Sequence, residues 1–219
     1  MNRTVQSAAA PLVKPRLRGV SHQVAFFAAL VAGAVLIALA PPRAKVAAAI
    51  YATSLATLLG TSALYHRPHW APGPRRWMRR ADHAAIFVLI AGTYTPFTLL
   101  LPREGGAMLA LAWGGAALGI LRALFWVHAP RALAAALYIA FGAAALFFWS
   151  PLHAALGAAG LALLLFGGLL YATGAVIYAA RRPDPWPAVF GYHEIFHLLV
   201  VAAAICHFIV VVGVIRALR

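Results

Sequence analysis

Apolar residues run along this chain in seven long segments, separated by short polar connections. The segments cover approximately residues 20–40, 46–65, 83–101, 106–127, 131–149, 153–179 and 194–215. Each is close to the roughly 20 residues that a helix needs to cross a bilayer, and far longer than a barrel strand. The pattern therefore predicts an all-α membrane protein. It is expected to consist of a basic segment over residues 1–19 and a seven-transmembrane helix bundle over residues 20–215.

Composition supports this class and excludes others. Hydrophobic residues make up 64% of the 219, and charged residues only 10%. A soluble domain would have about a quarter of its residues charged, and a disordered chain would be far less hydrophobic. The single cysteine, Cys206, excludes an intrachain disulfide and a thiolate metal cluster.

The Lys and Arg residues divide unequally between the two sides of such a bundle. Thirteen of the 18 fall at the amino terminus and in the second, fourth and sixth connections, and 5 fall on the other side. Cytoplasmic connections carry the excess of Lys and Arg, so the amino terminus is expected to be cytoplasmic and the carboxyl terminus outside. The net charge of +14 is then explained by topology and by anchoring to membrane lipids. No nucleic-acid partner is expected, because no base-reading module is visible.

Polar residues interrupt the apolar segments at three places: Ser62 and His66, then Asp82 and His83, then His193, Glu194 and His197. The first group ends the second segment, and the others open the third and seventh. In an alternating bundle these three positions lie at one face of the membrane, which the charge count makes the cytoplasmic face. Polar residues at this depth are costly and therefore indicate function.

The spacing of the histidines suggests a metal site. His193 and His197 are four residues apart, so they share a helix face and can ligate one ion. His66 could supply a third nitrogen, and three imidazoles plus a water form a catalytic zinc site. Asp82 would then accept a proton from that water. Ser62, one turn from His66, could hydrogen-bond a substrate carbonyl or the water.

The same residues also have purely structural interpretations. A membrane histidine is often only a hydrogen-bond partner between helices. Asp82 could cap the amino terminus of the third segment, and Ser62 could bond to a carbonyl one turn earlier. His207 lies about 15 Å deeper than His197 and is expected to pack or hydrogen-bond. His22, at the edge of the first segment, is expected at the membrane interface.

A different chemistry is suggested by the literal match of residues 193–197 to H-E-x-x-H, the zinc-protease signature. In that interpretation Glu194 is the general base, and a further carboxylate ligand is needed. The other acids are only Asp82, Glu104 and Asp184. Glu104 is expected on the opposite face, and Asp184 lies in a proline-rich connection. An intramembrane metalloprotease therefore stays as an alternative.

Sequence blocks around these residues carry a family resemblance. Ser62-Ala-Leu-Tyr-His66, Asp82-His-Ala-Ala-Ile-Phe with Ala91-Gly-Thr-Tyr-Thr-Pro96, and Gly191-Tyr-His-Glu-Ile-Phe-His197 resemble the signature blocks of the hemolysin III family. This is the bacterial branch of the progestin and adipoQ receptors, and it is related to the alkaline ceramidases. The resemblance implies a zinc ion held by His66, His193 and His197, with Asp82 and Ser62 completing the set. It also implies that Glu194 is not the essential acid.

Together these features suggest a zinc-dependent hydrolase of the bacterial inner (plasma) membrane that acts on a lipid amide or ester. One alternative is a non-catalytic receptor or sensor in which zinc is structural. Another is a pore-forming cytolysin, although no continuous line of charges suits a water-filled pore.

Overall fold

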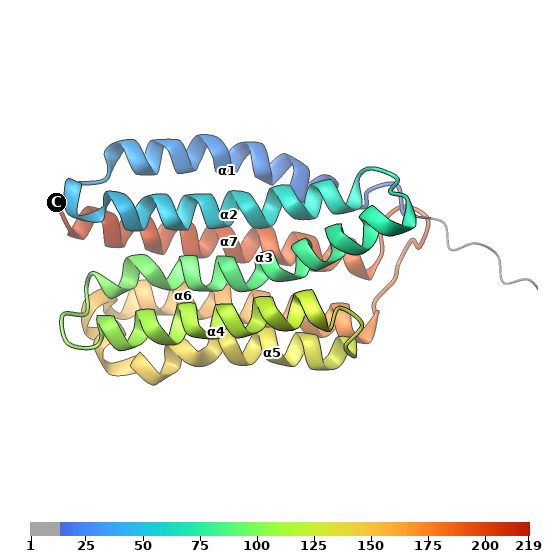
Figure 1. The fold of residues 1–219 in the computed structure, drawn as a ribbon. Coiled ribbons are helices and arrows are strands. Elements are labelled where there is room, and N and C mark those ends of the chain that lie inside the picture. Colours follow the sequence, from blue (N-terminus) through green and yellow to red (C-terminus); the bar gives the residue numbers. More distant parts are fainter. Residues whose placement is uncertain (1–13) are drawn as a thin grey trace, which may run out of the picture.

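A computed structural model describes residues 14–219, so most of the predicted basic segment 1–19 lies outside the described residues. From Lys14 onward the chain forms seven α-helices and two short 3-10 helices, with no strand among them. In chain order these are α1 (Val20–Leu39), η1 (Pro42–Ala44), α2 (Lys45–His66), α3 (Pro72–Thr98), α4 (Gly105–Phe125), α5 (Arg131–Ala143), η2 (Ala144–Phe148), α6 (Trp149–Ala180) and α7 (Tyr192–Ala217). The prediction of an all-α protein is therefore confirmed (Figure 1).

The helices form a closed bundle. Helix α2 packs between α1 and α3, and α3 packs between α2 and α4. On the other side α6 packs between α5 and α7, and α7 also contacts α1 and α3, which joins the two halves. The described chain begins and ends at opposite ends of the bundle (Figure 1).

Hydrogen bonds identify which connections share an end. Arg43 Nε donates to the carbonyl of Leu218 at 2.7 Å, next to the carboxyl terminus. At the other end Lys14 Nζ donates to the carbonyl of Arg67 at 2.8 Å, just beyond the last residue of α2. We call this second end the histidine end, because His66 and the first turn of α7 lie there.

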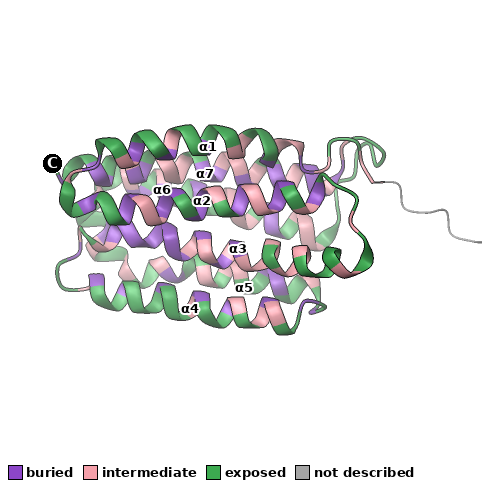
Figure 2. Cartoon of the chain, turned by 45° about the horizontal axis from the view of Figure 1, so that its top comes forward, coloured by how far each residue is buried: buried purple, intermediate pink, exposed green. Residues whose placement is uncertain are grey.

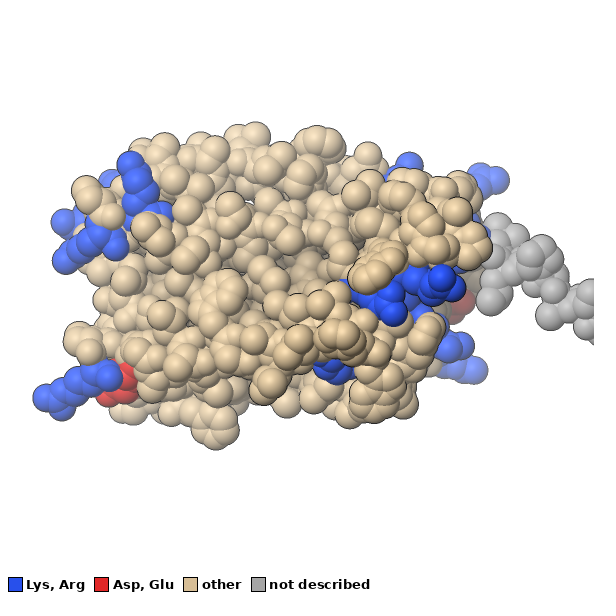
Figure 3. All heavy atoms as spheres, in the orientation of Figure 1, with Lys and Arg blue, Asp and Glu red and all other residues tan. Residues whose placement is uncertain are grey.

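The outer surface of the bundle is apolar. Five helical stretches are long and apolar enough to cross a membrane: Val20–Leu39, Pro42–His66, Gly105–Phe125, Arg131–Ala180 and Tyr192–Ala217. The outward faces of α1 and α4 are largely exposed (Figure 2). Lys and Arg gather at the two ends, while the middle of the visible face carries almost none (Figure 3). This distribution suits a protein whose middle section is surrounded by the hydrocarbon core of a membrane.

Helix α3 is long, but it is not among these five apolar stretches. It begins at Pro72, eleven residues before the predicted segment 83–101, because proline is favoured in the first turn of a helix. Asp82 thus lies inside the helix, and the prediction that it caps the amino terminus is wrong. Residues 91–97 are all buried, so this part of α3 faces protein rather than lipid. Its polar residues are tolerated there.

The predicted connection at Pro151 is also displaced. The short helix η2 leads directly into α6, and Pro151 lies in the first turn of α6, where proline is tolerated. The break falls instead at Gly157, whose φ of 67° and ψ of 175° are not helical. Glycine adopts this backbone region without a steric penalty.

A short strap, which we define as residues 14–19, precedes α1 and crosses the histidine end. Its backbone nitrogens at Arg16 and Leu17 donate to the carbonyls of Ala188 and Val189 at 3.0 and 3.1 Å. Gly19 ends the strap with a φ of 80°. The strap therefore ties the start of α1 to the connection between α6 and α7.

Candidate metal centre

Three buried imidazoles converge at the histidine end. The candidate ligand atoms of His66, His193 and His197 all lie within 4.8 Å of one another. The Nε2 atoms of His66 and His193 are 3.2 Å apart. The ring centroids of His66 and His197 are separated by 5.0 Å, and those of His193 and His197 by 4.6 Å. The structure thus brings together the three residues that the sequence suggested as ligands.

Helix geometry explains this convergence. His66 is the last residue of α2, and His193 and His197 lie in the first two turns of α7. Two residues four apart face the same direction, toward the end of α2. Aromatic rings enclose the group, with Tyr178 and Phe196 edge-on to His193 at centroid distances of 5.5 and 5.8 Å.

The start of α7 is held by Glu194. Its Oε2 accepts a hydrogen bond from the backbone N–H of Gly191 at 2.8 Å. Its Oε1 forms an ion pair with Arg18 of the strap. The carboxylate is only 3% exposed, and both of its oxygens have structural partners. Glu194 thus positions the two histidines that flank it.

The donor set fits a zinc ion. Two nitrogens bound tetrahedrally at 2.0–2.1 Å would lie about 3.4 Å apart, close to the separation of the His66 and His193 nitrogens. Within the described chain, Nδ1 of His197 is buried and makes no hydrogen bond. Buried polar atoms are almost always satisfied by a partner, which an ion or a water would provide. The identity of the metal stays a prediction.

Asp82 and Ser62 belong to the same region. Ser62 lies on α2 one turn before His66 and is buried. Asp82 lies on the neighbouring helix α3. Both side chains line the cavity that the three histidines also line. Their catalytic roles stay predictions.

His22 is a residue that the sequence interpretation placed wrongly. It was expected at the membrane interface, yet it is 2% exposed and stacks on His197. In the part of the chain that the structure describes, neither of its ring nitrogens has a hydrogen-bond partner. Odd-numbered helices of an alternating bundle begin on the same side of the membrane. The position of His22 near the start of α1 therefore indicated that it lies at the same depth as the histidines near the start of α7.

Two other histidines lie outside the cluster. His83 Nδ1 donates to the carbonyl of Arg79, one turn earlier, at 2.6 Å. His207 Nε2 donates to the carbonyl of Leu164 at 3.0 Å, as expected of a hydrogen-bonding residue. Neither nitrogen is available for the metal group.

The cavity extends well beyond the histidines. Its volume is about 1100 Å³, at the upper limit of common ligand pockets. Its polar lining includes Ser62, His66, Asp82, His193 and His197. The apolar part is lined by leucines that include Leu152, Leu161 and Leu164. The site can therefore accept a ligand with one polar and one long apolar part.

Comparison with known proteins defines the family. The family model described as Haemolysin-III related matches residues 11–208. The chain is 36% identical over 129 residues to a Hemolysin-3 homolog of Bacillus subtilis, a match that covers 58% of each chain. It is 35% identical over 163 residues to Hemolysin-3 of Bacillus cereus, covering 74% of this chain and 71% of that one.

A plant relative extends the comparison beyond bacteria. The chain is 32% identical over 149 residues to the Heptahelical transmembrane protein ADIPOR2 of Oryza sativa subsp. japonica. This match covers 59% of the chain and 64% of the rice protein. The family match and the apolar helices together identify a multi-pass integral membrane protein. The chain belongs to the hemolysin III family, whose relatives include adiponectin receptor-like proteins.

Proposed function

We propose that this protein is a zinc-dependent membrane hydrolase that cleaves a lipid amide or ester, as a ceramidase does. One observation carries the proposal. Three buried histidines with converging nitrogens share a single cavity of about 1100 Å³ with an acid, a serine and apolar walls. These are the parts that hydrolysis of a lipid needs.

Each residue has a distinct role in this proposal. A zinc ion held by His66, His193 and His197 would supply Lewis acidity toward a carbonyl group or a water molecule. Asp82 accepts the proton of the attacking water. Ser62 orients the Asp82 carboxyl or donates a hydrogen bond to the substrate carbonyl. Glu194 takes no part in proton transfer, because its oxygens hold Gly191 and Arg18.

The cavity also suggests how the lipid enters. Leu146, Leu165 and Leu169 line it and are also exposed on the outer surface of the bundle. The cavity therefore opens toward hydrocarbon along η2 and α6. A lipid can enter sideways with its acyl chain among the leucines and its amide or ester near the histidines.

We further propose that all seven α-helices cross the membrane, with the histidine end in the cytoplasm. The excess of Lys and Arg at that end supports this orientation, and the name of the rice relative describes it as heptahelical. A labelling experiment tests it in a Cys206→Ala background. A cysteine replacing His69 should react only with a reagent on the cytoplasmic side, and one replacing Glu104 only from outside. The reverse pattern would overturn the orientation.

Elemental analysis tests the metal. Purified protein should hold about one zinc per chain, as expected of a three-histidine site. The His197→Ala variant should lose it, and His153→Ala, which alters an exposed histidine of α6, should keep it. Absence of zinc and other divalent ions from the wild-type protein, after growth with these metals, would refute the proposed site.

Lipid turnover tests the reaction. The zinc-loaded protein should hydrolyse at least one member of a lipid panel that includes ceramides. Asp82→Ala should reduce the rate by about 10²-fold or more, as loss of a general base does. Glu104→Gln, a distant acid, should leave the rate unchanged. Equal rates in wild type and Asp82→Ala would exclude the hydrolase.

A receptor or sensor with structural zinc is the second candidate. Its support is the position of the histidines, which join α2 to α7, and the adiponectin receptor-like relatives. In that case chelation should lower the melting temperature, and Asp82→Asn should have no enzymatic effect because no lipid is turned over. A cytolysin, as the name of the Bacillus cereus relative suggests, would instead cause metal-independent dye leakage from liposomes.

A further inference from the structure

A second cavity of about 320 Å³ lies at the histidine end, beside the first. It is an open cavity lined by the end of α2, the connection after it, the first turns of α3 and the connection between α4 and α5. Its polar and aromatic lining consists of Tyr65, Trp70, Arg75, Arg76, Arg79 and His128. Trp70 is fixed in place, because its Nε1 donates to the carbonyl of Leu64 at 3.0 Å.

The charges of this cavity are unbalanced. Three guanidinium groups line it, and none of the four acids does. All four acids are among the described residues, where the one ion pair within 4.0 Å joins Arg18 to Glu194. Asp82, three residues after Arg79 on α3, lines the larger cavity and not this one. Arg75 and Arg76 therefore have no carboxylate partner.

Neighbouring charges confirm that the region is strongly positive. Burial lowers the pKa of Lys14, and the charges of Arg67, Arg18 and Arg75 lower it further. Arg80 is turned elsewhere, with its guanidinium 4.7 Å from the centroid of Trp77. The arginine run of α3 thus divides into residues that enclose a cavity and one that packs on an aromatic ring. Positive-inside topology alone does not require such an arrangement.

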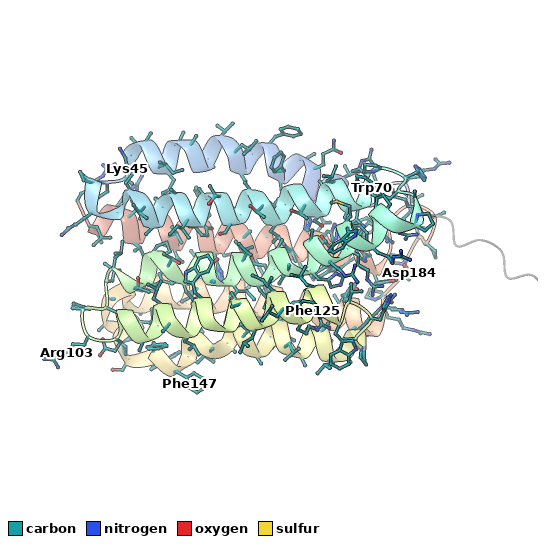
Figure 4. The ribbon with its side chains drawn as sticks, in the orientation of Figure 1. Lys45, Trp70, Arg103, Phe125, Phe147 and Asp184 are labelled. Atoms are coloured by element: carbon teal, nitrogen blue, oxygen red, sulfur yellow. The ribbon has the colours of Figure 1, made fainter. Side chains whose placement is uncertain are left out.

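We propose that this cavity binds the phosphate of an anionic phospholipid headgroup. Guanidinium groups match phosphate oxygens with paired donors, and basic pockets between membrane helices accept such headgroups. The surroundings favour a lipid over free phosphate. Phe125 and Trp126, directly before the part of the α4–α5 connection that lines the cavity, are 83% and 53% exposed, which places apolar surface beside it. Figure 4 shows Phe125 and Trp70 toward the same end of the bundle.

The two cavities share part of their walls. Tyr65, Trp70, Arg75 and Arg79 line both. A headgroup held by Arg75 and Arg79 would therefore lie against the wall of the cavity that contains the histidines. The binding site itself does not depend on any hydrolase activity.

Lipid binding by the purified full chain tests the proposal. The protein is titrated in zwitterionic nanodiscs with phosphatidylglycerol, with phosphatidylcholine as the uncharged reference and inorganic phosphate as a separate arm. Wild type should bind phosphatidylglycerol in preference to both. The Arg75→Gln/Arg76→Gln variant should bind it with an affinity lower by about tenfold or more, since the loss of one charge-assisted hydrogen bond costs more than 1.4 kcal/mol.

Matched variants distinguish binding at this cavity from a general attraction of the positively charged protein to anionic lipid. Arg181→Gln/Arg182→Gln removes two exposed charges outside the cavity and should keep wild-type affinity. Arg75→Lys/Arg76→Lys keeps the charge but loses the paired guanidinium donors, so it should also bind the lipid more weakly than wild type. It serves as the test if the glutamine variant fails to fold. The proposal is overturned if the control pair loses as much affinity as the glutamine pair, if the lysine pair binds as well as wild type, or if inorganic phosphate binds as tightly as the lipid.

Discussion

The imidazole of His22 lies flat against that of His197, with centroids 3.9 Å apart and planes 4° from parallel. One ring comes from the start of α1 and the other from α7. His22 thus supports the outer face of a candidate ligand without belonging to the ligand group.

Replacing His22 by phenylalanine should preserve the centre. Phenylalanine keeps a flat ring against His197 and removes two buried nitrogens without partners, each of which costs about 1–3 kcal/mol if it stays unsatisfied. We expect unchanged zinc content and an equal or higher melting temperature. His22→Ala should lower stability by about 2 kcal/mol through the cavity it leaves. Thermal unfolding in detergent and elemental analysis measure both effects, and zinc loss in His22→Phe would mean that this residue is a ligand.

Gly19→Ala should destabilise the protein at the junction of strap and centre. The backbone there has a φ of 80°, and an added Cβ would lie 2.7 Å from Cβ of His66. Strain of this kind costs on the order of 1–3 kcal/mol. The control is Gly106→Ala on α4, where an added Cβ meets nothing within 4 Å. It should be neutral or slightly stabilising, and equal melting temperatures for the two variants would contradict the packing described here.

Gly119→Ala should weaken the contact between α3 and α4. Its added Cβ would overlap Cδ1 of Phe87, a buried side chain of α3. Overpacking of this kind costs about 1–3 kcal/mol. Gly114→Ala, on the same helix but facing open space, provides the comparison in thermal unfolding. A larger loss in Gly114→Ala would show that α3 and α4 do not pack as described.

Breaking the ion pair between Arg18 and Glu194 should be costly. Arg18→Gln leaves a buried carboxylate without its cation, which is expected to reduce the free energy of unfolding by about 3 kcal/mol. The double variant Arg18→Gln/Glu194→Gln should recover part of this loss, because no charge is then buried alone. A double-mutant cycle by thermal unfolding measures the coupling. Additive losses would mean that the two side chains do not interact.

Most of the helical pattern and the histidine group could be predicted from the sequence. Long apolar segments define helices in lipid, because no other backbone arrangement satisfies its hydrogen bonds there. The alternation of helices then places His66 and His193 at one end whatever the orientation. That argument depends on depth alone, so errors of several residues at the helix ends did not affect it.

Features that depend on direction around a helix could not be predicted. The side of α1 on which His22 lies depends on packing against α7, and the apolar surface of α1 gives no preferred face. The start of α3 at Pro72 was missed, because arginine residues suit both a surface connection and a helix. The second cavity was not anticipated, because it is formed by two connections and the ends of two helices that only the folded chain brings together.

The histidine pair that meets through its Nε2 atoms is separated by 127 residues along the chain. A ribosome that has completed α2 must therefore translate most of the remaining message before the partner of His66 exists. The centre cannot assemble until that late helix has left the translocon and docked beside the early ones. Metal binding would then occur only in fully synthesised chains, and prematurely terminated chains would enter the bilayer without a metal ion.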